Sequence, residues 1–205
     1  MLATTDAIVL SLQPHSDKAH VLHAYTRAGG RVNYMVYGLG RKNTAGKYTP
    51  LSLIQITAEM PSSQEYNGKP ATLRTAQLAF VPRSITTDPY KRTIALFISE
   101  VLYHVLRHPM PDEQMYEFIE HAVRTLDDTG EPQNFHLRFL ADFATELGFA
   151  PASSNPLSVL QNEINIPFSR TERQQVLRQL CAYFAAHVET WQEPKSLDVL
   201  IEVFD

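Results

Sequence analysis

The sequence predicts an α+β protein in which a small barrel of five strands is followed by an all-α domain. Apolar residues alternate with a period of two before Pro82, whereas after Asp88 they recur every three to four positions. The charge changes sign at the same place: residues 1–82 carry eight Lys and Arg against four Asp and Glu, and residues 83–205 carry ten against eighteen. We therefore expect one domain at residues 1–82 and a second at residues 83–205.

Five segments of the first half have strand character. Ala28-Gly29-Gly30 joins the second and third as a hairpin, because glycines accept the positive φ that tight turns require. Pro14 is expected to stop the first segment. Five short strands in a flat sheet would expose a face and two edges, so a closed or nearly closed antiparallel barrel is the economical arrangement. The segments are Ala7–Leu12, His20–Thr26, Arg31–Tyr37, Leu51–Thr57 and Ala71–Phe80.

The second half contains amphipathic helical patterns. Gly148 is a suitable residue to end the third helix, and Ser169 with Glu172 has the spacing of a capping box that opens the fourth. These signals predict helices over Ile94–Val105, Met115–Leu126, Phe135–Leu147, Ser169–His187 and Leu197–Phe204.

A basic loop, Tyr37–Lys47, lies between two of the expected strands and contains no acid. Its glycines let the backbone approach a ligand closely, and the charges of Arg41, Lys42 and Lys47 suit phosphate oxygens. The loop therefore indicates a polyanion as ligand, and a solvated surface loop is the alternative. Only the first half is expected to bind a polyanion, because a uniformly acidic surface repels nucleic acids and anionic membranes.

Three tyrosines lie on the second and third strands, the surface on which small five-stranded barrels stack nucleobases. Tyr25 and Tyr34 could instead fill or rim the barrel core, whereas Tyr37 runs directly into the basic loop and is the better candidate for stacking. Three further arginines at strand ends could contact phosphates, or their side chains could simply extend into solvent. They are Arg27, Arg31 and Arg74.

Catalytic motifs are not found. The segment Gly40–Lys47 resembles a phosphate-binding loop, but it has five residues between its glycines instead of four, and Tyr48 stands where Ser or Thr should hold magnesium. No nucleophile elbow occurs, and Cys181 has apolar helical neighbours, which favours a core residue over a reactive thiol. We expect a protein that is not an enzyme and has no cofactor.

The supply of metal ligands is poor. His104 and His108 are four residues apart and could share a metal, but no Glu follows His104 and Pro109 ends the helix. A single cysteine excludes an internal disulfide and a cysteine-rich zinc site, and it fits a reducing cytoplasm. Since no apolar run reaches 18 residues, no contact with a membrane is expected.

Several short motifs, in order and spacing, resemble the bacterial RecO family, whose amino-terminal domain is an OB-fold. The similarity runs nearly from end to end of the chain. The motifs lie at Asp6–Leu10, Tyr25–Val32, Tyr37–Thr44, Thr49–Leu51, Leu73–Ala76, Leu147–Phe149 and Lys195–Leu200.

The resemblance implies a nucleoid-associated recombination mediator. Such a protein binds single- and double-stranded DNA, anneals complementary strands, contacts the tail of single-stranded DNA-binding protein and, with RecR, helps to load RecA. Two other functions stay open: a protein-interaction adaptor with little DNA contact, and an RNA-binding OB-fold protein. The salt dependence of DNA binding separates a mediator from an adaptor, because displaced counterions give a steep slope.

The resemblance also places a tail-binding arginine at Arg138, beside Phe139, where a guanidinium could pair with a terminal carboxylate. An ordinary ion pair with Asp142 is the alternative. The sequence departs from the family in two places. Phe149–Phe168 has no cysteine where many relatives carry a four-cysteine zinc module, and Gly40 replaces the first basic residue of the loop.

Overall fold

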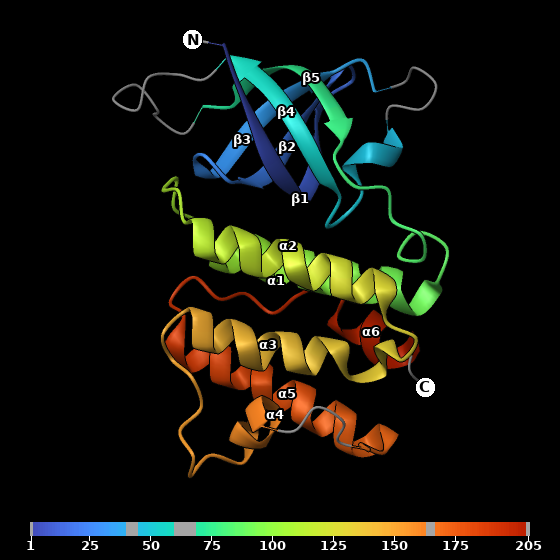
Figure 1. Cartoon of the computed structure of the whole chain (residues 1–205), viewed down its shortest axis with the longest axis vertical. Helices are drawn as coiled ribbons and strands as arrows, with labels where there is room; N and C mark the ends of the chain where they lie inside the picture. The colour runs from blue at the N-terminus through green and yellow to red at the C-terminus, as the bar shows by residue number, and fades with distance from the viewer. Residues whose placement is uncertain (1, 40–44, 60–68, 163–166, 204–205) are drawn as a thin grey trace. The chain divides into compact units, whose positions relative to one another are not determined.

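The structure, a computed structural model, describes residues 2–39, 45–59, 69–162 and 167–203. The chain forms two compact units (Figure 1). The barrel unit comprises Met1–Pro82 and Leu106–Val123, and the helical unit comprises Arg83–Val105 and Arg124–Asp205. The first segment of the barrel unit ends where the sequence pattern changes. Residues 106–123 nevertheless belong to the barrel unit, where they make polar and backbone contacts with residues 27–31.

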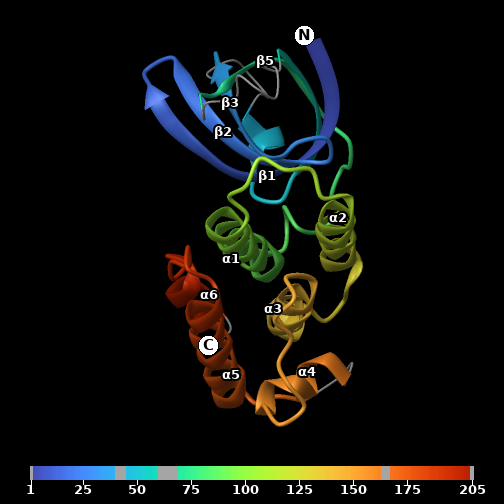
Figure 2. The same ribbon diagram turned by 90° about the vertical axis from the view of Figure 1, so that its left-hand side faces the viewer.

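Five strands close into a barrel in the order β1-β2-β3-β5-β4, which confirms the predicted architecture (Figure 2). One pair differs from the antiparallel expectation: β3 and β5 run parallel and pair only at Tyr34 with Ala71 and at Met35 with Thr72. The strands are β1 (Leu2–Ser16), β2 (Ala19–Thr26), β3 (Gly30–Tyr37), β4 (Leu53–Glu59) and β5 (Ala71–Leu78).

The prediction that Pro14 stops the first strand is wrong, because β1 continues to Ser16. Pro14 lies opposite His20 of β2, next to an irregularity in the register. The pairing of β1 with β4 covers Leu2–Ile8, so Pro14 is in the part of β1 that pairs with β2. A proline is tolerated at such an edge because its missing N–H leaves no ladder partner unsatisfied there.

The alternating pattern of β3 predicts its burial correctly. Val32, Tyr34 and Val36 point into the barrel core, and the residues between them are partly exposed. Tyr48, from the short 3₁₀ helix η1 (Ala45–Tyr48), completes this core. Tyr25 is buried as well. The core interpretation therefore holds for Tyr34. Tyr25 lies on the face of β2 opposite Leu22 and Ala24, which belong to the barrel core, so it is buried outside that core.

Gly30 begins β3 with a φ of +61°. A Cβ at this position would lie 2.1 Å from the backbone oxygen of Met110, so the site excludes side chains for two separate reasons. The next residue, Arg31, donates its backbone N–H to His108 O at 3.1 Å. The backbone of the hairpin thus lies directly against residues 108–110.

The predicted helices form, although Phe204, the predicted end of the last one, lies outside the described residues. Gly148 follows α3 with a φ of +83°, and Ser169 and Glu172 make the predicted capping box. Among the described residues, none of the helices combines the length and apolarity that crossing a membrane requires. The helices are α1 (Pro89–Val105), α2 (Glu113–Asp128), η2 (Pro132–Asn134), α3 (Phe135–Glu146), η3 (Pro156–Ser158), α4 (Val159–Asn162), α5 (Arg170–His187) and α6 (Leu197–Val203).

Stacked aromatic rings fill the core of the helical unit. Phe143 lies 5.6 Å from Phe139 and 5.8 Å from Phe184, measured between ring centroids, and Phe184 lies 5.3 Å from Trp191. Such offset pairs add to the free energy of burying the rings. The packing joins α3 to α5 and to the segment that follows α5.

A buried carboxylate fixes the start of the helical unit. Asp127 accepts the backbone N–H groups of Arg83 at 2.8 Å, Ser84 at 2.8 Å and Ile85 at 2.9 Å. Burial alone would raise the pKa of Asp127, but these hydrogen bonds outweigh burial and lower it. Lys91 is buried beside this group and donates to Asp127 O at 2.7 Å. Nothing in the sequence pattern indicated this contact.

Candidate nucleic-acid interface

Two of the residues expected to contact phosphate, Arg41 and Lys42, lie outside the described residues, and their role stays a prediction. The other four predicted basic residues lie in the barrel unit. Each of the four makes a polar contact within that unit. These residues are Arg27, Arg31, Lys47 and Arg74.

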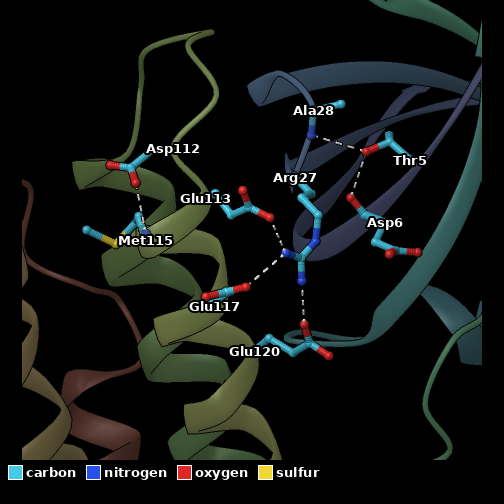
Figure 3. A network of polar contacts seen from close by, with 9 residues as sticks. All are labelled: Thr5, Asp6, Arg27, Ala28, Asp112, Glu113, Met115, Glu117 and Glu120. Carbon is cyan, nitrogen blue, oxygen red and sulfur yellow. Dashed lines mark hydrogen bonds and ion pairs between the residues drawn. The ribbon is translucent and has the colours of Figure 1, made fainter.

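Arg27 lies at the turn of the β2–β3 hairpin and contacts three carboxylates of α2 (Figure 3). Its Nη1 donates to Glu113 at 3.0 Å and to Glu117 at 3.3 Å, and its Nη2 donates to Glu120 at 3.1 Å. The guanidinium also lies 4.5 Å from the ring centroid of Tyr116, a cation–π contact. Burial opposes the charge, but the hydrogen bonds to Glu113 and Glu117 outweigh burial and raise the pKa of Arg27.

Backbone contacts hold the turn in this position. The backbone N–H of Arg27 donates to Asp6 O at 3.0 Å. The backbone N–H of Ala28 donates to Thr5 Oγ1 at 3.2 Å (Figure 3). Since both acceptors belong to β1, the turn is fixed to the barrel wall independently of the ion pairs with α2.

The remaining three basic side chains bind nearby acceptors. Arg31 Nη1 donates to Leu106 O at 3.3 Å. Lys47 Nζ donates to Ala76 O at 2.6 Å, on β5. Arg74 pairs with Glu59 of the neighbouring strand β4, and its Nε donates to Glu59 Oε1 at 3.0 Å. In this structure the four cations therefore stabilise the barrel unit itself.

Tyr37 is the described site residue most open to a ligand, with 64% of its surface exposed at the end of β3. The next residue, Gly38, donates its N–H to Lys18 O at 3.4 Å. Lys18 is exposed in the turn between β1 and β2 and was missed by the sequence analysis. The β1–β2 loop of five-stranded barrels commonly binds oligonucleotides, which was the available signal.

His23 and Asn33 pair on adjacent strands, with 2.6 Å between Nδ1 and Oδ1. Both side chains are half-buried. Burial lowers the pKa of His23, and so does the charge of Arg31, although the hydrogen bond to Asn33 acts in the opposite direction. This pair therefore offers hydrogen bonding to a ligand at neutral pH, but no positive charge.

The predicted tail-binding residues lie on α3. Arg138 Nε is 3.8 Å from Asp142 Oδ2, and both side chains are half-exposed. Burial raises the pKa of Asp142 and the charge of Glu146 adds to this, whereas Arg138 lowers it. Phe139 is buried against Phe143. The structure thus shows the ion pair that was the alternative reading of Arg138, and it places Phe139 in the core.

A shallow surface hollow, with space for about one water molecule, lies in the helical unit. Arg173, at its edge, donates to Asn134 Oδ1 at 3.0 Å and to Phe168 O at 3.3 Å. Complete burial, together with the charge of Arg173, lowers the pKa of His136 to about 3. The hollow therefore combines guanidinium groups with apolar walls. Its lining residues are His136, Arg170, Arg173, Gln174, Leu177, Leu200 and Ile201.

Two arrangements that resemble reactive sites have structural explanations. Lys91 Nζ donates to Ser84 Oγ at 2.6 Å, as in serine–lysine hydrolases, but Asp127 occupies the N–H groups that could otherwise stabilise an oxyanion. His104 lies on α1, which ends at Val105, so His108 does not continue the same helix. Within the described ranges, no group of three or more His, Cys, Asp or Glu could hold a metal ion.

Comparison with known families matches both halves of the chain. The family described as "Recombination protein O N terminal" matches residues 1–67, and "Recombination protein O C terminal" matches residues 86–194. Proteins named DNA repair protein RecO are similar to this chain over its whole length and over their own whole length. The relative from Phocaeicola vulgatus is 30% identical over 245 positions, that from Porphyromonas gingivalis 28% over 249, and that from Christiangramia forsetii 27% over 239.

These alignments are longer than the chain, which has 205 residues. The relatives therefore contain residues without a counterpart here. We predict that some of these additional residues correspond to the connection Phe149–Phe168, where a zinc module is expected to be missing.

Proposed function

Since this chain belongs to the RecO family of DNA repair proteins and functions in DNA repair and recombination, we propose that it is a recombination mediator whose barrel unit binds DNA. It binds single and double strands, promotes annealing and, with RecR, supports the loading of RecA onto DNA covered by single-stranded DNA-binding protein. Binding to chromosomal DNA would make the protein nucleoid-associated.

The observation that carries this proposal is the exposed end of β3 on a closed five-stranded barrel. Tyr37 offers a ring face for base stacking, and Lys18 lies close to it through the hydrogen bond to Gly38. The rest of the basic loop, Gly38–Lys47, follows Tyr37 directly in the chain. Stacking and phosphate contacts are the two terms that proteins combine to bind single strands without sequence preference.

Arg41 and Lys42 carry the main phosphate contacts in this proposal. Lys47, Arg27, Arg31 and Arg74 contribute less, because each would have to exchange an intramolecular acceptor for a phosphate oxygen. An exposed ion pair is worth about 1 kcal/mol or less, so such exchange is possible.

Titration of a labelled single-stranded oligonucleotide at several salt concentrations tests the assignment. Replacing Arg41 and Lys42 together by Ala should reduce the salt slope by about 1 to 1.5, because each phosphate that is no longer neutralised accounts for roughly 0.7. Replacing Arg92 and Lys195 by Ala removes the same charge from exposed positions of the helical unit and should leave the slope unchanged. An equal slope in both double variants would refute the assignment.

The same titration addresses the other candidate functions. An adaptor that docks a protein through its barrel would show weak DNA binding with a shallow salt slope. An RNA-binding protein would prefer an RNA oligomer in direct competition with DNA of the same sequence. No feature of the described residues favours either of these over a mediator.

The proposed contact with single-stranded DNA-binding protein is through its acidic, aromatic-ended tail. Arg138 is the primary candidate, and its partner Asp142 would have to release it. Arg170, which is exposed beside the shallow hollow, is a second candidate, because its guanidinium lies next to apolar side chains.

Calorimetry with a tail peptide distinguishes the two locations. If Arg138 binds the terminal carboxylate, Arg138→Ala should weaken binding by about 1.5 to 3 kcal/mol, and Arg170→Ala should have little effect. The opposite result would move the site to the hollow. Neither variant should change the affinity of the barrel unit for DNA, and a matching loss of DNA binding would contradict the tail assignment.

A further inference from the structure

The contact between Arg27 and α2 contains more negative charge than one guanidinium can neutralise. Three carboxylates, which we call the acidic face of α2, surround the single cation of Arg27 (Figure 3). Two of the carboxylate side chains are largely exposed, at 72% for Glu113 and 63% for Glu117, and Glu120 is 23% exposed. The contact is therefore strongly acidic and open to solvent.

Without Arg27, repulsion among the three carboxylates would destabilise α2. Glu113, Glu117 and Glu120 follow one another at spacings of four and three residues, where like charges on a helix repel. Only Glu113 is in the first turn, where the helix dipole stabilises an acid. Arg27 relieves this repulsion, because all three carboxylates of the acidic face contact its guanidinium at once.

Both terminal nitrogens of Arg27 are engaged by these carboxylates. A bidentate contact with a phosphate uses the same donors, so a nucleic acid must compete with the acidic face to reach Arg27. The carboxylates thus stand where phosphate oxygens would bind. Two of the three carboxylates are exposed, so solvent weakens their attraction for Arg27. A polyanion can therefore compete with them.

The second arginine of the hairpin is held in a similar way. Arg31 Nη1 donates to Leu106 O, and its backbone N–H donates to His108 O, so residues 106–123 engage both arginines at this end of the barrel. Gly30 allows the close approach, because a side chain there would collide with Met110.

We propose that the acidic face of α2 is an internal competitor that masks Arg27 and lowers the affinity of the β2–β3 hairpin for nucleic acid. This inference rests on the proposed DNA binding by the barrel unit. In this arrangement Arg27 adds a contact to nucleic acid only when a phosphate displaces the carboxylates.

Neutralising the exposed carboxylates tests the masking. Glu113→Gln with Glu117→Gln keeps the shape and hydrogen-bond acceptors of α2 but removes two charges. A released Arg27 adds about one phosphate contact, so the salt slope for single-stranded DNA should become steeper by roughly 0.7. At about 0.1 M salt the affinity should rise on the order of fivefold.

Removing any two acids raises the affinity for DNA to some extent, so the control is a thermodynamic cycle with Arg27. The same double substitution is measured in an Arg27→Gln background, where only the general effect of charge remains. Masking predicts that most of the gain and the whole change in slope disappear in that background. An equal gain in both backgrounds would overturn the proposal.

A second readout does not depend on DNA. Phenylglyoxal modifies accessible arginines, and the modification of Arg27 can be followed by mass spectrometry of its peptide. The rate at Arg27 should increase severalfold in the double Gln variant, while that at Arg74, which pairs with Glu59, stays constant. An unchanged rate at Arg27 would refute the masking even if DNA binding is intact. A faster rate with no DNA binding in any variant would confirm the masking and refute the proposed function.

Discussion

Arg27 shows why the sequence predicts the charge of a side chain more readily than its partner. The acceptors of Arg27 lie 86 to 93 residues away in the chain, and no periodicity connects positions so distant. Tyr34 and Tyr37 were easier, because strand alternation and the position beside the basic loop separate the core ring of Tyr34 from the exposed ring of Tyr37. Asp127 gave no signal, since its partners are backbone groups that every residue possesses.

His136 makes the stability of the helical unit depend on pH. Its imidazole is fully buried and its pKa is lowered to about 3, first by burial and then by Arg173. In the unfolded chain the imidazole titrates near pH 6.5. Below that pH the unfolded state binds a proton that the folded state does not, so stability is present above pH 6.5 and is lost as the pH falls towards 3. The loss should approach about 1.4 kcal/mol per pH unit.

Chemical denaturation at pH 7 and pH 5 measures this dependence, and His136→Phe, which cannot titrate, is the control. The parent should lose more free energy of unfolding between the two pH values than the variant does. NMR titration of the ring checks the cause directly. A pKa near 6.5 in the folded protein would contradict the expected behaviour.

Regular elements followed from the sequence where one face of each is buried. Burial enforces the alternation of β3 and the stripes of α1, α2, α3 and α5, so these elements were recognised. The short helix α4 was missed because four residues contain too little of a helical period. Pro14 and the parallel pairing of β3 with β5 depend on which strands become neighbours, which local patterns do not determine.

Gly30 is the element boundary most sensitive to substitution. Gly30→Ala should cost more than about 1 to 2 kcal/mol, because a left-handed backbone is unfavourable for alanine and Met110 must also move. Gly38→Ala is a matched control, since Gly38 has a φ of +72° but no described atom within 4 Å of an added Cβ. Denaturant melts of both variants give the comparison. Equal losses of stability would show that the approach of Met110 contributes nothing.

The division of the chain into two units does not follow its amino-acid composition alone. Charge and periodicity place a boundary near Pro82, and the barrel unit does include everything before it. Composition could not show that residues 106–123, which are acidic and include the first part of α2, join the basic barrel. Opposite charge explains the association: the acidic face of α2 meets Arg27, and the segment before α2 supplies backbone acceptors to Arg31.

Hydrogen–deuterium exchange with and without a single-stranded oligonucleotide tests most directly whether the barrel unit carries the DNA-binding surface. We expect slower exchange on DNA binding in the turn at Lys18 and from Tyr37 through Lys47, with little change in residues 124–205. At Arg27 and in residues 113–123, exchange should become faster if phosphate displaces the acidic face. Protection confined to the helical unit, with none around Tyr37, would contradict the proposed role of the barrel in binding DNA.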